Sequence, residues 1–169
     1  MHIALLSAQQ HSTLTDLLVE LYAYYNGESG TIARDVVEEH LHENLLSPGS
    51  PLRLVVASHP ERGVVGFAAV AVLYSLVDPT PPNRKQCLLK ELYVRSAERG
   101  HGVGQRLMLW VGEYAVAQGC CRIDWNVKAS NHRGIAFYES LGAEQVEDRL
   151  SLRVTGAKIA QLPRPSEVG

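Results

Sequence analysis

The sequence predicts an α/β fold, because segments with the periodicity of strands are interspersed with segments that have the periodicity of helices. Residues 122–128 alternate between apolar and polar side chains, which is typical of a strand with one buried face. Residues 12–25 instead place apolar side chains three and four positions apart, as an amphipathic helix does. Residues 88–107 join the two patterns, since a strand-like run ends near Val94 and a glycine-rich turn then enters a helical pattern.

The predicted elements follow the order β-α-α-β-β-β-α-β-α, with one or two more strands at the end. Strands are expected at residues 3–7, 52–58, 64–76, 86–95 and 122–128 and within 144–154. Helices are expected at residues 12–25, 33–46, 103–118 and 131–141. Turns rich in Gly, Pro and Asn separate them. A single domain over residues 1–160 accommodates all of these elements, and we expect residues 161–169 to form a disordered tail.

Composition limits the classes of function. The chain has 169 residues, of which 46% are hydrophobic, as in a globular domain. Its formal net charge of −2 gives no sign of a basic surface, so nucleic acid is not an expected partner. No apolar run approaches a membrane span, and no signal peptide is visible. The cysteines, Cys87, Cys120 and Cys121, are odd in number and two are adjacent, which favours a reducing cytoplasm over disulfides.

Three alternate glycines, Gly100, Gly102 and Gly104, stand between the predicted strand and the predicted helix. The first turn of a helix has N–H groups without partners, and its dipole favours negative charge. Glycines also let a ligand approach the backbone closely. We therefore expect a phosphate-bearing ligand at residues 100–105.

The loop fits one of three known phosphate motifs. A P-loop requires Lys and then Ser or Thr after its last glycine, but Gln105 and Arg106 follow Gly104. The dinucleotide motif G-x-G-x-x-G lacks its third glycine here. The pattern R-x-x-G-x-G fits, beginning at Arg99 and ending at Gly104. A glycine-rich turn that enters a helix without binding a ligand is the alternative.

A second motif lies about thirty residues downstream. It matches the pattern N-x-x-A-x-x-F-Y-x-x-x-G-F/A through Asn131, Phe137, Tyr138, Gly142 and Ala143, with glycine in place of its first alanine. With the R-x-x-G-x-G loop, this chain resembles the GNAT superfamily of acetyl-coenzyme A-dependent N-acetyltransferases. In look it is closest to the diamine (spermidine/spermine-type) and related small-amine acetyltransferases.

The resemblance implies a mixed, twisted sheet of six to seven strands with helices on both faces. It also implies that the strand ending near Val94 splays from the strand at residues 122–128, and that acetyl-coenzyme A lies in the gap. A homodimer is plausible from the family. The residues expected to bind the cofactor are Leu92, Tyr93, Val94, Arg99, Gly100, His101, Gly102, Val103, Gly104, Gln105, Asn126, Asn131 and Phe137. Asn131 could instead cap its own helix, and Arg99 could be a solvated side chain beside a turn.

Acyl transfer to an amine requires a base and an acid, because an alkylamine arrives protonated and the thiolate leaves unprotonated. We expect Glu91 to be the base and Tyr138 the acid. Alternatively, Glu91 is a solvated carboxylate paired with Lys90 or Arg95, and Tyr138 only packs.

Tyr25 and Glu28 are expected to contact the substrate, because an aromatic and acidic wall suits an organic cation. Alternatively, Tyr25 belongs to the core. No metal site is expected, since His40 and His42 lie two apart and point to different faces of a helix. The predicted activity is acetylation of a polyamine, diamine or amino-acid-like amine. An aminoglycoside or protein amine as acceptor, a non-catalytic acyl-coenzyme A sensor and a domain without a nucleotide ligand are the alternatives.

Overall fold

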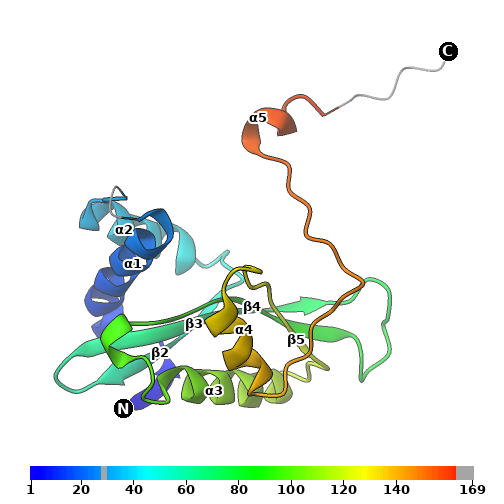
Figure 1. Ribbon diagram of the computed structural model, residues 1–169, viewed down its shortest axis with the longest axis horizontal. Helices are drawn as coiled ribbons and strands as arrows, with labels where there is room; N and C mark the ends of the chain where they lie inside the picture. Colours follow the sequence, from blue (N-terminus) through cyan, green and yellow to red (C-terminus); the bar gives the residue numbers. More distant parts are fainter. Residues whose placement is uncertain (28–29, 163–169) are drawn as a thin grey trace. The chain divides into compact units, whose positions relative to one another are not determined.

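The computed structural model describes residues 1–27 and 30–162 (Figure 1). The chain divides into two units, residues 1–128 and the residues from 129 onward, and each is described by itself. The first unit contains the sheet and three of the predicted helices.

One sheet of five strands, in the order β1-β2-β3-β4-β5, forms the centre of the first unit. The strands are β1 (His2–Leu5), β2 (Arg53–His59), β3 (Gly63–Tyr74), β4 (Lys85–Val94) and β5 (Ile123–Asp124). The first four pair antiparallel, and β5 pairs parallel with β4, so the sheet is mixed as predicted. The prediction of six to seven strands was wrong.

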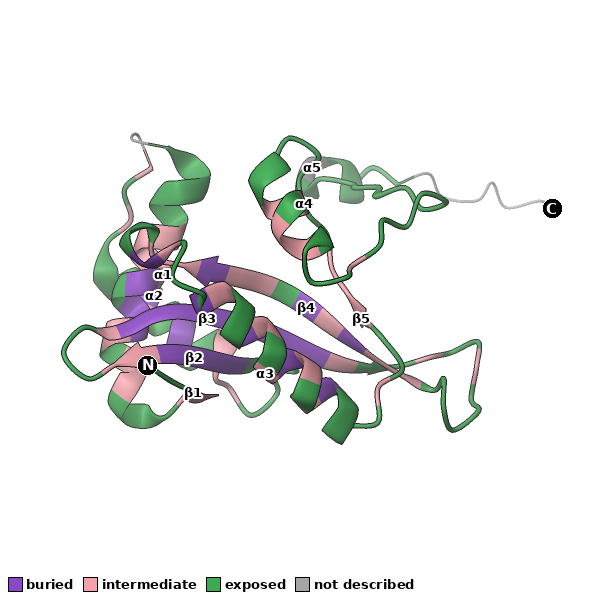
Figure 2. Cartoon of the chain, turned by 60° about the horizontal axis from the view of Figure 1, so that its bottom comes forward, coloured by how far each residue is buried: buried purple, intermediate pink, exposed green. Residues whose placement is uncertain are grey.

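Helices cover both faces of this sheet (Figure 1). On one face lie α1 (His11–Asn26) and α2 (Arg34–His40), which continues as one π-helical turn at Leu41–Leu45. On the other face lies α3 (Val103–Ala117). The buried positions follow the strands β2 to β4 and the inner sides of the helices (Figure 2).

The core under α1 joins the helix to the sheet. It consists of Leu14, Leu17, Leu41, Leu54, Val56, Val64, Phe67, Ala69 and Tyr93. Each fully buried leucine in such a core stabilises the fold by about 1.5–3 kcal/mol relative to exposure. The core therefore fixes α1 over β3 and β4, which positions the carboxyl-terminal turn of α1 beside β4.

On the opposite face, α3 buries one stripe of side chains. Val103, Leu107, Val111 and Ala115 recur at intervals of four and are all buried, as their spacing predicts. Short helices elsewhere in the first unit follow Ser7 and Arg95, at Ala8–Gln10 and Ser96–Glu98.

A bulge in β4 decides which residues face α1. In the β3–β4 pair, Ala69 lies opposite Glu91 and Val70 lies opposite Leu89, so Lys90 has no partner. Directly opposite residues share a face, and Ala69 belongs to the core under α1. Leu89 therefore faces the α3 side, while Glu91 and Tyr93, beyond the extra residue, face the α1 side.

The pairing between β4 and β5 is short. It consists of Cys87 with Ile123 and Leu88 with Asp124. A strand was predicted over residues 122–128, but β5 ends at Asp124 because the chain beyond it no longer pairs with β4. The expected splay between these strands is therefore present.

The second unit contains α4 (His132–Glu139) and the short α5 (Gly156–Ile159). Residues 144–154, predicted as one or two strands, form no strand. A strand needs a neighbour to satisfy its backbone groups, and the described residues 129–162 contain no strand with which this segment could pair. Across the described part of the chain, no helix combines the length and apolar character that a membrane crossing requires.

The buried stripe of α3 gives a test of the fold. Leu107 is completely buried, so Leu107→Ala is expected to lower the free energy of unfolding by about 2–5 kcal/mol. Leu109 lies on the same helix with 64% of its surface exposed, so Leu109→Ala is the matched control and should change stability little. Denaturant unfolding measures both, and equal losses would contradict the assigned face.

Candidate active site

Glu91 is held by a tyrosine from α1. The Tyr25 hydroxyl donates to the two carboxylate oxygens of Glu91 at 3.1 and 3.2 Å. Burial raises the pKa of Glu91 above its ordinary value, and the hydrogen bond from Tyr25 partly offsets this shift. A half-buried carboxyl group with a raised pKa is suited to accept a proton near neutral pH.

The alternative partners of Glu91 were Lys90 and Arg95, and Lys90 does stabilise its charged form, though less than burial opposes it. Arg95 forms its ion pair with Glu20 of α1, with 2.8 Å between Nη2 and Oε1, and thus does not neutralise Glu91. Tyr25 is 48% exposed, so the expectation that it belongs to the core is excluded. Glu28, the other expected substrate residue, lies outside the described residues.

Arg99 lies between aromatic rings. Its guanidinium is 5.3 Å from the ring centre of Tyr24 and 5.4 Å from that of Tyr93, and its Nε donates to the Val94 carbonyl at 2.8 Å. These contacts fix the end of β4 to the end of α1. A phosphate role for Arg99 stays a prediction, but the side chain is not simply solvated.

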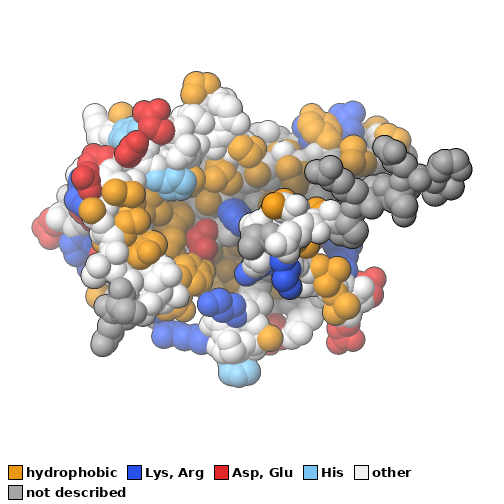
Figure 3. All heavy atoms as spheres, turned by 90° about the horizontal axis from the view of Figure 1, so that it is seen from above, with side chains coloured by type: hydrophobic (Ala, Val, Ile, Leu, Met, Phe, Trp, Pro, Cys, Tyr) orange, Lys and Arg blue, Asp and Glu red, His pale blue; other side chains and the backbone are white. Residues whose placement is uncertain are grey.

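Acidic side chains gather over α1 and α2 on the same side of the sheet (Figure 3). They include Asp16, Asp35, Glu38 and Glu39. Arg34 offsets part of this charge by pairing with Asp16 at 2.7 Å and with Glu38 at 2.8 Å. The charged side chains found nearest to Tyr25 and Glu91 are instead basic, since Lys128 lies 5.1 Å from the ring centre of Tyr25 and Lys90 stabilises the charged form of Glu91.

The glycine loop has the backbone that the sequence predicts. Gly100 and Gly102 have φ angles of 84° and 76°, in the left-handed region that favours glycine. Gly102 is the N-cap of α3, and the first helical bond runs from the Arg106 N–H to the Gly102 carbonyl at 3.1 Å. The amides of residues 103–105 therefore have no partner within the helix. The first turn of α3 contains no acidic side chain, and an acidic side chain there would repel an anion.

The backbone of β4 beside this loop is paired on one side. Leu92, Tyr93 and Val94 lie opposite Ala68, Phe67 and Gly66 of β3. The pairing with β5 has already ended at Leu88, so the other side of this segment is a sheet edge within the first unit. An edge of this kind offers backbone donors and acceptors to an extended ligand.

The remaining expected residues lie beyond β5. Asn126 is exposed on the segment that follows β5. In the second unit, the Asn131 side chain accepts a hydrogen bond from the Gly134 N–H at 3.0 Å, so the capping alternative is confirmed, and its cofactor contact stays a prediction. Phe137 and Tyr138 lie on α4 with their ring centres 5.1 Å apart.

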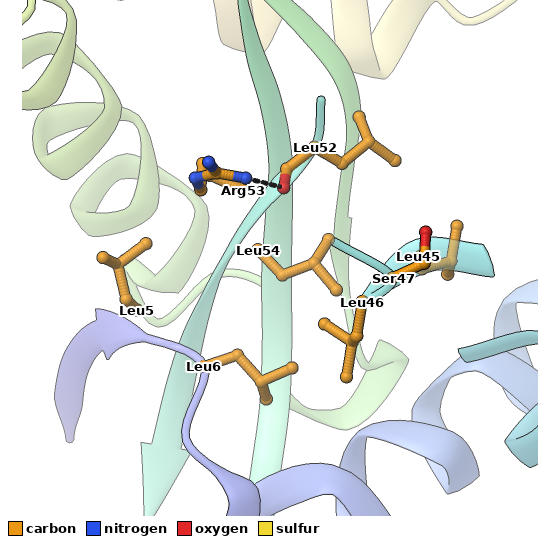
Figure 4. Close-up of a pocket in the computed structure, with 8 residues that line it drawn as sticks. All are labelled: Leu5, Leu6, Leu45, Leu46, Ser47, Leu52, Arg53 and Leu54. Atoms are coloured by element: carbon orange, nitrogen blue, oxygen red, sulfur yellow. Dashed lines mark hydrogen bonds between the residues drawn. The ribbon is translucent and has the colours of Figure 1, made fainter. Parts of the chain in front are cut away.

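Cys87 and the pocket beside β1 and β2 show no features of an acyl-transfer site. Burial raises the pKa of the Cys87 thiol to about 11, which disfavours the nucleophilic thiolate. A pocket of about 200 Å³ beside β1 and β2 is lined mainly by leucines (Figure 4). Its one charged residue, Arg53, donates to the Leu52 carbonyl at 2.9 Å. Within residues 1–27 and 30–162, no group of three or more His, Cys, Asp and Glu side chains is placed to hold a metal.

Comparison with known proteins identifies the family of the chain. The model of the acetyltransferase (GNAT) family matches residues 14–143, which include the loop, Glu91 and α4. The chain belongs to the GNAT family of acetyltransferases.

Two curated relatives of this GNAT chain are named as acetyltransferases of small amines. It is 31% identical over 107 residues to a thialysine N-epsilon-acetyltransferase of Mus musculus, which covers 59% of this chain and 57% of that protein. It is 32% identical over 68 residues to an L-ornithine N5-acetyltransferase of Arabidopsis thaliana, covering 40% of this chain and 30% of that protein. The matches thus span less than two thirds of these relatives.

A solved structure shares the GNAT fold over nearly the whole chain. The integron cassette protein VCH_CASS6, from the mobile metagenome of V. cholerae, superposes with a TM-score of 0.85 at 26% identity. The alignment covers 95% of this chain and 96% of that protein.

The structure brings further residues next to Tyr25 and Arg99, of which the sequence had pointed to Tyr24 alone, through its place in the tyrosine-rich end of the first helix. Tyr24 packs on Arg99, and Glu20 pairs with Arg95. The Lys128 ammonium lies 5.1 Å from the ring centre of Tyr25. Only the polar face of the alternating segment at residues 122–128 gave a signal for Lys128, and its contact with α1 depends on tertiary structure.

Proposed function

We propose that this GNAT chain transfers the acetyl group of acetyl-coenzyme A to a primary amine of a small molecule. The observation that carries the proposal is the half-buried Glu91 carboxyl group, held by Tyr25 where the edge of β4 is free. The relatives named for thialysine and ornithine support a small amine as the acceptor.

Two groups of backbone atoms in the first unit are suited to bind the cofactor. The amides of residues 103–105 suit the diphosphate, since they are unpaired and lie at the positive end of the α3 dipole. The backbone edge at Leu92, Tyr93 and Val94 suits the two amides of pantetheine. A backbone N–H near Val94 would stabilise negative charge on the thioester oxygen during attack.

Glu91 acts as the base in this proposal. It accepts the proton of the acceptor ammonium, directly or through one water, and the neutral nitrogen then forms a bond to the thioester carbon. The nitrogen loses its second proton as the intermediate collapses to the amide, and this proton returns through solvent to the phenolate that Tyr138 becomes on protonating the thiolate. The raised pKa of Glu91 supports this role, because a carboxylate with an ordinary pKa would be a weaker base. Burial raises the pKa of Cys87 and Cys120, which supports direct attack rather than transfer through either thiol.

Tyr138 acts as the acid in this proposal. As the carbon–sulfur bond breaks, the thiolate of coenzyme A takes the hydroxyl proton of Tyr138. The position of Tyr138 beside Phe137 in the family motif supports the assignment.

We further propose a cytoplasmic location, which the free thiols of Cys87, Cys120 and Cys121 support. A homodimer is proposed from the family resemblance alone.

Glu91→Gln is the first test. We expect a loss of about 10²-fold or more in kcat with acetyl-coenzyme A and a small amine, measured as thiol release. For the wild type, kcat/KM should decrease as the pH is lowered, because Glu91 becomes protonated and no longer acts as a base. This decrease should begin at a higher pH than the ordinary glutamate pKa of 4.5 would give.

The melting temperature of Glu91→Gln shows whether any loss of activity comes from unfolding. Because burial raises the pKa of Glu91, its ionised form weakens the fold at pH values above that pKa, and Glu91→Gln should not lower the melting temperature at pH 8. Glu113→Gln, at an exposed carboxylate on α3, is the control and should leave both quantities unchanged. Normal turnover in Glu91→Gln would exclude Glu91 as the base.

Tyr138→Phe is the second test. We expect a strong fall in turnover, about 10²-fold, with little change in the Kd for acetyl-coenzyme A, since only the hydroxyl group is removed and the ring remains. Isothermal titration gives the Kd and thiol release gives the turnover. Unchanged turnover would remove Tyr138 from the mechanism, and cofactor binding by the wild type without turnover of any amine would favour a sensor.

A further inference from the structure

Lys128 and Glu91 contact two different parts of one tyrosine, its ring and its hydroxyl group. The Tyr25 hydroxyl donates to Glu91 at 3.1 Å, and the Lys128 ammonium lies 5.1 Å from the centre of the Tyr25 ring. The Tyr25 side chain therefore contacts both a carboxylate and an ammonium, and a molecule bound against it can reach both. All three residues belong to the first unit.

Within residues 1–27 and 30–162, the ammonium of Lys128 forms no ion pair, whereas the basic groups nearby have polar partners. Glu20 pairs with Arg95, and Arg99 donates to the Val94 carbonyl. Among the side chains that the structure describes, no carboxylate forms an ion pair with Lys128. Lys128 is also exposed, so its charge is available to a molecule bound beside Tyr25.

This arrangement distinguishes acceptors by their second charged group. An acceptor whose amine meets Glu91 and whose chain lies along Tyr25 brings its far end to Lys128. A carboxylate there gains a charge-assisted contact, and a second ammonium meets a like charge.

We propose that Lys128 is a specificity-determining residue, which selects amino acids with a side-chain amine over diamines. This inference rests on the proposed acetylation of small amines, and it names the group that recognises the acceptor.

The chain contains a matched control for this contact. Lys85, at the other end of β4, lies over the ring of Tyr74 with 5.3 Å between ammonium and ring centre. Lys85→Met thus removes the same charge and the same kind of ring contact away from Glu91. If Lys128 were only a surface lysine packed on an aromatic ring, the two substitutions would have equal effects on acceptor preference.

The experiment compares ornithine with putrescine, because the two differ only by the carboxylate. Thiol release gives kcat/KM for both acceptors with wild type, Lys128→Met, Lys128→Glu and Lys85→Met. The wild type should prefer ornithine, and Lys128→Met should lower kcat/KM for ornithine about tenfold while that for putrescine stays equal or rises. Lys128→Glu should reverse the preference, and Lys85→Met should retain it.

The outcomes separate this inference from the proposed function. The wild type could turn over both amines with a preference that does not change in Lys128→Met or Lys128→Glu. This result would overturn the role of Lys128 and leave the acetyltransferase proposal intact. Equal preference shifts in Lys85→Met and Lys128→Met would overturn it as well. If the wild type turned over neither amine and none in a wider panel, the proposed function itself would fail. Melting temperatures of the variants identify any loss caused by unfolding.

Discussion

The structure depends on β4, a strand that is paired on one side along its whole length except at the Lys90 bulge and, within the first unit, is mostly unpaired on the other. Its bonds to β3 run from Lys85 to Val94, whereas its parallel pairing with β5 consists of two residue pairs. A sheet edge inside a fold is normally covered or paired, because unpaired backbone groups are costly when they lose contact with water. Within the first unit, the free edge lies next to the glycine loop and α3, and this is where we propose that the extended cofactor binds.

The bulge at Lys90 gives this edge its chemistry. Without the extra residue, Glu91 would share the face of Leu89 and point toward α3. With it, Glu91 and Tyr93 point toward α1, whose last turns supply Tyr24 and Tyr25. One inserted residue thus brings a carboxyl group, an aromatic wall and a free backbone edge together, and burial there raises the pKa of Glu91.

Much of this could be predicted from local sequence. The spacing of Val103, Leu107 and Val111 gave the buried face of α3, and the alternate glycines gave the positive φ angles at its start. These features follow from periodicity and from the conformational freedom of glycine, which act within a few residues.

What the sequence could not give depends on partners far apart in the chain. The bulge at Lys90 is defined only by the register with β3, and β5 is short because β4 diverges from it. The strands expected within residues 144–154 had the composition for pairing but no neighbour in their own unit. Lys128 and Tyr25 are about a hundred residues apart, so no local pattern predicts their contact.

The central claim is that coenzyme A binds along the free edge of β4 with its diphosphate at the start of α3. Backbone amide chemical shifts, followed by NMR while coenzyme A is titrated into the protein, test it most directly. The largest changes are expected at Leu92, Tyr93 and Val94 and at residues 103–105. Saturating changes confined to other regions, such as the leucine-lined pocket beside β1, would contradict the account.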